Sequence, residues 1–289
     1  MSSRKRKEEK AASDQPEIKC WSNGEMIEGH KMVSSLTAGF HYSLAVWEGI
    51  RAYNGKPFRL KDHVQRLYRS AQMLEMPILF PQREVYNAIL ELVKQFDPEL
   101  DLYIRPIAYL SNTEKDYFDK KTMNLDIYVF PIKHDSSKQV RLYTSNFRRS
   151  FPYFNMQIKI PANYWMINSA KAQFPDADGV LFLDKDGYVV ESGVANLFIF
   201  KGSELITPPA DGSILPGITR QTIMDEVYPT TERKITLQDI YEASGAFLCG
   251  TYTEIQRISH VDGFKIGADD FKMVDTIRNR YLEIVKGGN

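Results

Sequence analysis

The stretch QIKIPANY places a lysine where it could do chemistry. Lys159 lies between Ile158 and Ile160, directly before a proline. Few lysines lie in apolar surroundings, and one that does can lose its charge and act as a nucleophile. The ordinary alternative is a strand with one wet face, from which the ammonium group reaches water. The motifs elsewhere in the chain decide between the two interpretations.

Two other charged residues border apolar segments. Glu191 ends the run GYVVE and could either pair with a neighbouring side chain or face a protonated pyridine nitrogen. Arg59, in KPFRLKDH, stands at a predicted strand-to-helix junction. A guanidinium group there could form a surface ion pair or hold a phosphate.

The stretch SILPGITRQTIM has a proline–glycine turn before a predicted helix whose first turn carries Ile218 and Thr219. Free N–H groups at a helix start, with a hydroxyl beside them, can bind a phosphate, although an ordinary capped helix would look similar. An amine, a partner for a ring nitrogen and a phosphate seat are together the parts that a pyridoxal phosphate enzyme requires.

Hydrophobic periodicity predicts the elements that position these residues. Residues 58–74 and 83–96 show the spacing of amphipathic helices, and residues 123–132 alternate like a half-buried strand. Beyond residue 140 strands dominate, with a Lys-Asp-Gly turn between two β-rich runs. A last helix is predicted over residues 269–285.

This order of elements predicts an α+β protein of two domains. We expect a charged, disordered tail at residues 1–16, a first domain at 17–132, a linker at 133–139 and a second domain with the lysine at 140–289. A nuclear address is the alternative for the basic tail. Clefts between domains are common ligand sites, so a ligand is expected there.

Composition excludes several classes of partner. The 289 residues contain 37 Lys+Arg and 37 Asp+Glu, so no excess charge is present to bind nucleic acid or an anionic membrane. No apolar run reaches the ~18 residues of a membrane span. The only cysteines, Cys20 and Cys249, form no disulfide framework, and with no secretory signal they favour the cytoplasm. A small-molecule partner is expected.

Six motifs carry a resemblance to a known family, in its order and with similar spacing: VWEGIRAYNGKPFRLKDHVQRL, LYIRP, KIPANY, DGYVVESGVANLF, TPPADGSILPGITR and GTYTEI. From about residue 18 onwards the chain resembles the fold-type IV pyridoxal phosphate enzymes, and among them the branched-chain amino acid aminotransferases. The resemblance implies two α+β domains with the cofactor in the cleft between them. It also implies a homodimer or higher homo-oligomer in which a partner subunit completes the active site.

The resemblance implies a role for each matching residue. Lys159 is the catalytic lysine that binds pyridoxal 5'-phosphate covalently, Tyr164 contacts the ring hydroxyl and Glu191 the ring nitrogen. The remaining cofactor-binding residues are Arg59, Leu215, Ile218, Thr219 and Thr251. The substrate pocket is expected to contain Tyr42, Trp47, Arg51, Tyr103, Arg105 and Tyr252.

Three positions depart from the family pattern. Val194-Ala195-Asn196 stands where Gly-Glu-Asn is common, and the missing acid would have oriented Arg51. Tyr252 replaces a small residue that approaches the substrate carboxylate, and Ser43-Leu44 replaces a glycine-containing sequence. These departures affect the substrate pocket and leave the cofactor residues intact.

The implied reaction is amino-group transfer from a branched-chain L-amino acid to 2-oxoglutarate by a ping-pong mechanism. Aminodeoxychorismate lyase and D-amino acid or amine transaminases share the fold and are the alternatives. The chain lacks the Arg-x-His pair usual in D-amino acid enzymes and has the EGIRAY and YIRP features that the lyase typically lacks. A non-catalytic binding protein is disfavoured by the intact set of Lys159, Tyr164 and Glu191.

Overall fold

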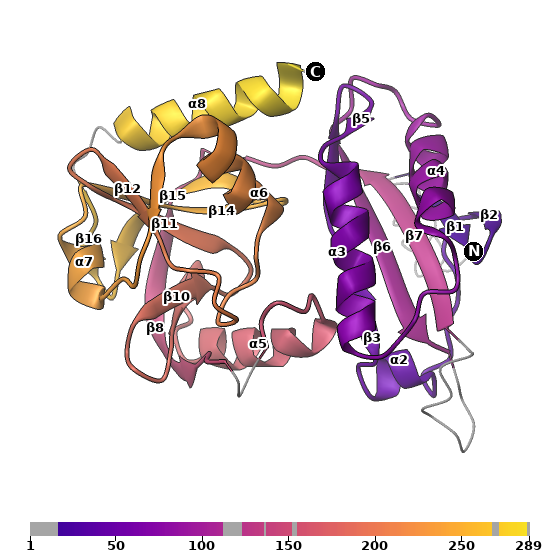
Figure 1. The fold of residues 1–289 in the computed structure, drawn as a ribbon, viewed down its shortest axis with the longest axis horizontal. Helices are drawn as coiled ribbons and strands as arrows, with labels where there is room; N and C mark the ends of the chain where they lie inside the picture. The colour runs from indigo at the N-terminus through magenta and orange to yellow at the C-terminus, as the bar shows by residue number, and fades with distance from the viewer. Residues whose placement is uncertain (1–16, 112–122, 136, 152–154, 268–271, 288–289) are drawn as a thin grey trace, which may run out of the picture.

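A computed structural model describes residues 17–111, 123–135, 137–151, 155–267 and 272–287. Two lobes, each built on its own sheet, lie side by side (Figure 1). The strands of the first sheet end at Pro131 and those of the second begin at Val140. The expected linker, 133–139, lies between these two strands.

The first lobe has a seven-stranded sheet in the order β2-β1-β7-β6-β4-β5, with β3 also paired to β6. All of its pairings are antiparallel. Its strands are β1 Lys19–Ser22, β2 Glu25–Glu28, β3 Ala45–Trp47, β4 Ile50–Tyr53, β5 Lys56–Pro57, β6 Leu102–Leu110 and β7 Met123–Pro131. The helices are α2 Ala38–His41, α3 Leu60–Met73 and α4 Gln82–Val93.

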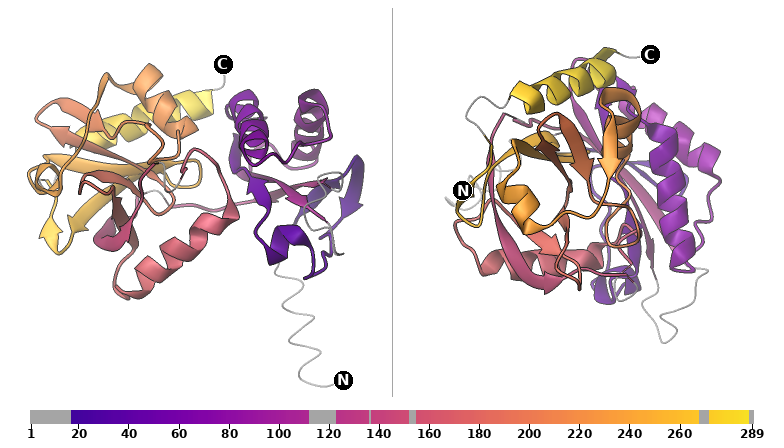
Figure 2. Two further views of the ribbon diagram at one scale, coloured as in Figure 1. Left: turned by 60° about the horizontal axis from the view of Figure 1, so that its bottom comes forward. Right: turned by 60° about the vertical axis from the view of Figure 1, so that its left-hand side comes forward.

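Helices α3 and α4 pack side by side against this sheet (Figures 1 and 2). The apolar stripe of α3 and the inward residues of α4 meet alternate residues of β7, because a strand presents every second side chain to one face. Leu67, Ile89, Leu125 and Ile127 are all fully buried in this core. The predicted helices and the predicted strand of this lobe are confirmed.

The second lobe has nine strands in the order β10-β9-β8-β15-β14-β11-β12-β13, with β16 paired to β15. Because β10 also pairs with β11, the run from β10 to β11 closes into a ring. The strands are β8 Val140–Arg148, β9 Gly179–Leu183, β10 Val189–Ser192, β11 Asn196–Lys201, β12 Glu204–Thr207, β13 Thr230–Glu232, β14 Gly245–Gly250, β15 Glu254–Val261 and β16 Phe264–Lys265.

Helices pack around this ring (Figure 2). They are η2 Pro161–Asn163, α5 Tyr164–Ala172, α6 Ile218–Thr222, the π-helical turn η3 Ile223–Val227, α7 Leu237–Tyr241 and α8 Lys272–Gly287. In β11, Leu197 and Ile199 point into the ring while Phe198 and Phe200 pack under α8. The run NLFIF is therefore apolar on both faces because both faces are covered.

Most predicted elements of this lobe are confirmed, including the turn at Asp184–Tyr188 between β9 and β10 and the last helix, whose described part begins at Lys272. The ordinary alternative for Lys159, a strand with one wet face, is wrong, because residues 158–160 have no regular structure. The expected tail at residues 1–16 lies outside the described residues. No helix among the described residues is long and apolar enough to cross a membrane, and none of their side chains cluster as a metal site would require.

Candidate active site

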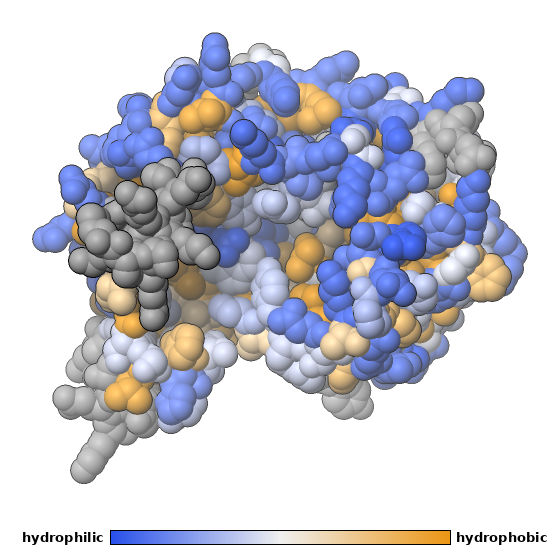
Figure 3. Space-filling model, turned by 180° about the vertical axis from the view of Figure 1, so that it is seen from behind, coloured by the Kyte–Doolittle hydropathy of each residue, from blue (hydrophilic) through white to orange (hydrophobic). Residues whose placement is uncertain are grey.

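A cavity of about 240 Å³ lies between the two lobes and takes its lining from both. Seen from behind, the molecule is hollowed there and hydrophobic residues line part of the hollow (Figure 3). The cavity brings together eleven of the fourteen residues expected in the site: Trp47, Tyr103, Arg105, Lys159, Tyr164, Glu191, Leu215, Ile218, Thr219, Thr251 and Tyr252. Arg59, Tyr42 and Arg51 are not among the lining residues.

The main chain of Lys159 is fixed by the first lobe, although the residue belongs to the second. Its N–H donates to Ser70 Oγ on α3 at 3.3 Å, and its carbonyl oxygen accepts from the N–H of Trp47 at 3.2 Å. The ammonium nitrogen Nζ lies 4.1 Å from the centroid of the Trp47 ring. These contacts direct the amine into the cavity.

Burial lowers the pKa of Lys159 to about 8, and the neighbouring Arg66 and Arg105 act in the same direction. Glu48 and Glu191 oppose the shift. A lysine in this environment has a much larger neutral fraction at physiological pH than one in water, because desolvation penalises the ammonium form. The apolar setting therefore favours a nucleophilic amine.

Glu191 lies on β10 and is 4% exposed. Its Oε1 accepts from Arg149 Nη1 at 3.1 Å, and its Oε2 accepts from Asn196 Nδ2 at 3.1 Å and from the N–H of Leu215 at 3.3 Å. Burial raises the pKa of Glu191 to about 7, against the lowering effects of Arg149, Leu215 and Lys159. A carboxylate placed in this way can accept a hydrogen bond from a protonated nitrogen.

The turn before α6 closely approaches Asn196, the first residue of β11. Asn196 Nδ2 also donates to the carbonyl oxygen of Leu215 at 2.9 Å, and a Cβ on Gly217 would lie 2.0 Å from Asn196 Oδ1. A side chain at position 217 would displace Asn196. Helix α6 begins at the next residue, so the N–H groups of Ile218 and Thr219 lie directly after this turn. Thr219 is buried, and Thr251 comes to the same cavity from the turn after β14.

Arg66, on α3, reaches this part of the cavity from the other lobe. It donates to Glu48 through Nε at 2.6 Å and Nη2 at 2.8 Å, and through Nη1 to the carbonyl oxygen of Pro216 at 3.0 Å. Burial opposes ionisation of Glu48, but Arg66 and His63 outweigh it and hold the pKa of its carboxyl below the usual range. Arg66 is therefore a fixed, buried cation beside the α6 turn.

Arg59 is not among the residues that line the cavity. It precedes α3 with a left-handed backbone (φ 51°), and its guanidinium group forms ion pairs with Glu226 and, at 3.8 Å, with Asp62. Its side chain is 37% exposed. The structure thus places Arg66, and not Arg59, at the cavity.

The opposite part of the cavity is aromatic and contains one arginine. Arg105 Cζ lies 4.4 Å from the Trp47 ring centroid, and its Nη2 is 3.5 Å from the Tyr103 hydroxyl. The rings of Tyr103 and Tyr252 meet edge to face at 5.9 Å. Tyr164 completes the group at 6.1 Å from Trp47, and desolvation by burial raises its pKa.

Arg51 and Tyr42 lie outside this lining. Arg51 is 3% exposed and forms ion pairs with Asp101 at 2.7 Å and Glu254 at 3.0 Å. Arg51 thus has two carboxylate partners although the VAN sequence lacks an acid. Glu254 directly follows the turn that carries Tyr252, so Arg51 supports the cavity from behind. Tyr42, after α2, is 46% exposed.

Sequence reasoning missed Glu48, Arg66, Arg149 and Asn196. One signal was available for Arg66: His63, Arg66 and Ser70 follow one another at helical spacing beside the apolar stripe of α3, and all three are buried. Glu48, Arg66 and Asn196 also fall within the quoted motifs, whereas Arg149 falls in none of them.

This architecture, two α+β lobes with a lysine-bearing cavity between them, is that of the fold-type IV aminotransferases. Residues 45–261 match the family model described as "Amino-transferase class IV". The chain therefore belongs to the class IV aminotransferases. The probable branched-chain-amino-acid aminotransferase of Rickettsia bellii is 34% identical over 279 residues, which cover 92% of this chain and 96% of that protein. The branched-chain-amino-acid aminotransferase of Pseudomonas aeruginosa is 30% identical over 290 residues, covering 92% of each.

Solved structures agree with this assignment. The T.th. branched-chain amino acid aminotransferase complexed with N-(5'-phosphopyridoxyl)-L-glutamate has a TM-score of 0.84 at 30% identity, and the match covers 93% of this chain and 94% of that one. The branched-chain aminotransferase from Thermoproteus uzoniensis with norvaline has a TM-score of 0.83 at 31% identity, with coverage of 93% and 95%. The predicted fold class and enzyme class are thus confirmed.

Proposed function

We propose that this enzyme uses pyridoxal 5'-phosphate to transfer the amino group of a branched-chain L-amino acid to 2-oxoglutarate. One observation carries the proposal: the amine of Lys159, the carboxylate of Glu191 and the α6 turn with Arg66 line a single cavity. An amine, an anion and a seat for an anion are what the aldehyde, the ring nitrogen and the phosphate of this cofactor require.

The residues present fit the cofactor. In the proposal Lys159 binds it covalently, Tyr164 contacts its ring hydroxyl and Glu191 contacts its ring nitrogen. Arg66 is proposed at the phosphate in place of Arg59, together with Leu215, Ile218, Thr219 and Thr251, because Arg66 lines the cavity beside the α6 turn and Arg59 does not line it. When bound, the cofactor supplies a ring that withdraws electrons from the substrate Cα.

Lys159 is proposed to move the proton. Its Nζ accepts the proton of the substrate Cα, and burial assists this step because it lowers the pKa of the ammonium form to about 8. The contact with the Trp47 ring at 4.1 Å limits where the amine can swing. The first oxo acid leaves before the second one binds, which gives ping-pong kinetics.

The aromatic part of the cavity is proposed to hold the side chain of the substrate. Trp47 and Tyr103 offer apolar walls to an aliphatic group, while Arg105 between them offers a guanidinium group to the distal carboxylate of glutamate. The names of the relatives, branched-chain aminotransferases from several organisms, support this substrate class.

A second copy of the chain is the proposed partner. Residues 32–42 expose an apolar series on the first lobe, with Met32 at 91% and Phe40 at 73% exposure, and Tyr42 ends that segment. Exposed apolar surface of this kind marks interaction sites. A homodimer would cover the segment and could bring Tyr42 to the partner's cavity, which explains why Tyr42 is absent from its own.

Borohydride reduction of the purified protein, followed by peptide mass mapping, tests the cofactor assignment. We expect a phosphopyridoxyl group on Lys159, and a label on Lys171 or no label would contradict it. Absorbance changes in single half-reactions with L-leucine, L-glutamate and D-alanine then test the substrate. Conversion of D-alanine without conversion of L-leucine would overturn the branched-chain assignment and leave the cofactor assignment standing.

A further inference from the structure

Arg149 is a buried cation that the proposed reaction does not use. It directly follows β8 and is 1% exposed, and its guanidinium carbon lies 3.8 Å from the centroid of the Phe182 ring. It is not among the residues that line the cavity. A buried charge is costly unless it is paired and hydrogen-bonded, so its contacts should show what it serves.

The hydrogen bonds of its guanidinium group all lead to β10 and the turn after it. Nη1 donates to Glu191 Oε1 at 3.1 Å and to the carbonyl oxygen of Ser192 at 3.3 Å. Nη2 donates to the carbonyl oxygen of Gly193 at 3.4 Å. The backbone of Arg149 is fixed in turn, because its N–H donates to the carbonyl oxygen of Leu183 at 2.9 Å. Arg149 thus binds Glu191 from the side away from the cavity.

The two carboxylate oxygens of Glu191 have different partners. Oε1 is held by Arg149, whereas Oε2 is held by Asn196 and Leu215, the two residues that border the α6 turn. Both oxygens accept, and each of these three partners donates, so the site is built for a carboxylate and not for a carboxylic acid. Among the described residues, the other titratable groups acting on this site are Lys159 and the buried thiol of Cys249.

We propose that Arg149 is the positioning residue that keeps Glu191 ionised and oriented, so that Glu191 can hold a proton on the ring nitrogen of the cofactor. The inference rests on the proposed function for its cofactor, but its effect on Glu191 belongs to the protein alone. Burial already raises the pKa of Glu191; without the guanidinium group only the N–H of Leu215 and Lys159 would oppose it, so the pKa would rise further and Glu191 would be protonated at neutral pH. Arg149 therefore acts on the reaction through Glu191.

The first test needs no cofactor. The carboxylic acid band of Glu191 is followed by infrared spectroscopy of the apoprotein against pH, and the band is identified by its absence in Glu191→Gln. The midpoint is expected near pH 7 in the wild type and about 1–3 pH units higher in Arg149→Met, because a cation in contact lowers a carboxyl pKa by that amount. Arg149→Lys keeps the charge and should restore most of the shift.

The second test uses the holoenzyme with ¹⁵N-labelled pyridoxal phosphate, whose ring-nitrogen chemical shift reports protonation. Arg149→Met should move the shift toward the unprotonated value and slow the L-leucine half-reaction roughly 10²-fold. In a Glu191→Gln background the same substitution should change the rate little, because residues acting through one another are not additive. Thermal unfolding of each variant records any loss of stability separately.

The outcomes are distinct. An unchanged infrared midpoint in Arg149→Met, or an equal rate loss with and without Glu191, would overturn the inference and assign Arg149 to support of the turn at Gly193. If Arg149→Met does not fold, Arg149→Lys is the deciding variant. An infrared midpoint at the wild-type value in Arg149→Lys supports a charge effect. A midpoint raised by the amount expected from burial alone contradicts it. Failure of the wild type to bind pyridoxal phosphate would instead contradict the proposed function, while the infrared result would still stand.

Discussion

At the scale of single residues, the amine of Lys159 is expected to react at a pH where other lysines do not. Only a neutral amine is nucleophilic, and burial holds the pKa of Lys159 at about 8, whereas a lysine in water titrates near ~10.4. Competitive acetylation of the apoprotein across pH, read by mass spectrometry, should therefore show half-maximal labelling of Lys159 near pH 8. The exposed Lys171 of α5 serves as the reference in the same digest. Parallel labelling of the two lysines would contradict the prediction.

The two arginines of the α3 region provide a matched pair. Arg66→Lys removes the Nη1 donor that contacts the α6 turn, and we expect it to weaken pyridoxal phosphate binding to the apoprotein about 10- to 100-fold, the value of a charged hydrogen bond. Arg59→Lys should change the affinity by less than about twofold, since Arg59 pairs with Glu226 outside the cavity. Absorbance titrations give both constants.

Pyridoxal, which lacks the phosphate, is the control ligand for this pair. Its binding should be nearly the same in wild type and Arg66→Lys if the arginine acts on the phosphate. A thermal scan is needed as well, because Arg66 also neutralises the buried Glu48. A larger effect of Arg59→Lys than of Arg66→Lys would restore the assignment made from sequence.

Arg105 is expected to distinguish the two substrates. Stacked between Trp47 and Tyr103, it can meet a distal carboxylate, which glutamate has and leucine lacks. Arg105→Ala should lower kcat/KM of the glutamate half-reaction roughly 10- to 100-fold more than that of the leucine half-reaction. Stopped-flow absorbance on each half-reaction measures the ratio, and Arg105→Lys should recover part of it. Equal losses would mean that Arg105 only packs against the rings.

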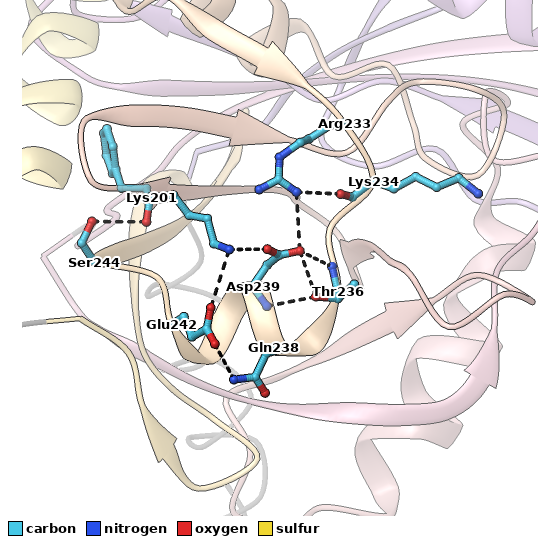
Figure 4. A network of polar contacts seen from close by, with 9 residues as sticks. Lys201, Arg233, Lys234, Thr236, Gln238, Asp239, Glu242 and Ser244 are labelled. Atoms are coloured by element: carbon cyan, nitrogen blue, oxygen red, sulfur yellow. Dashed lines mark hydrogen bonds and ion pairs between the residues drawn. The ribbon is translucent and has the colours of Figure 1, made fainter.

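At the scale of elements, the start of α7 is held by a polar network away from the cavity (Figure 4). Thr236 Oγ1 accepts from the N–H of Asp239 at 3.0 Å, Asp239 Oδ2 accepts from the N–H of Thr236 at 2.9 Å, and Lys201 on β11 joins Asp239 at 2.5 Å. Thr236→Ala should cost about 1 kcal/mol of unfolding free energy, since it leaves the first N–H groups uncapped. Gln238→Ala, which removes only a surface contact with Glu242, should cost less than about 0.5 kcal/mol. Urea unfolding curves compare them, and equal losses would exclude a capping effect.

Helix α3 shows what the sequence could and could not predict. Its apolar spacing predicts the helix and its buried side, because periodicity is a local property. Burial of His63, Arg66 and Ser70 depends on Lys159 and Glu48, which reach α3 through the tertiary fold; Lys159 is 89 positions from Ser70. The sequence therefore pointed to Arg59 for the phosphate and missed Arg66. The irregular backbone at Lys159 likewise follows from contacts with α3 and β3 and not from its flanking isoleucines.

At the scale of the whole molecule, the site exists only where the two lobes meet. Trp47, Arg66, Tyr103 and Arg105 come from the first sheet and α3, whereas Lys159 and the rest of the cofactor residues come from the second half of the chain. The motifs could be ordered along the sequence, and that order predicted the fold type. The sequence did not predict how the two sheets face one another. That arrangement places Arg66 at the cavity and Tyr42 outside it.

The apolar segment at residues 32–42 leads to the last prediction. If a second copy covers it, Phe40→Asp replaces a buried ring by a charge on both sides of a twofold interface. Burial of one phenylalanine is worth about 1.5–3 kcal/mol, so the two copies together should weaken dimerisation roughly 10²- to 10⁴-fold. Light scattering after size exclusion should show a dimer for the wild type and a monomer for Phe40→Asp at low micromolar concentration.

Phe264→Asp is the matched control, because Phe264 is a phenylalanine of similar kind, 59% exposed on β16 of the other lobe. That variant should remain dimeric and active. Phe40→Asp should lose activity together with the dimer, since a monomer lacks the Tyr42 that a partner would bring to its cavity, and Tyr42→Phe in an intact dimer isolates that contribution. A monomeric wild type that transaminates L-leucine would contradict both the dimer and the role of Tyr42, and the 32–42 segment would then need another partner to cover it.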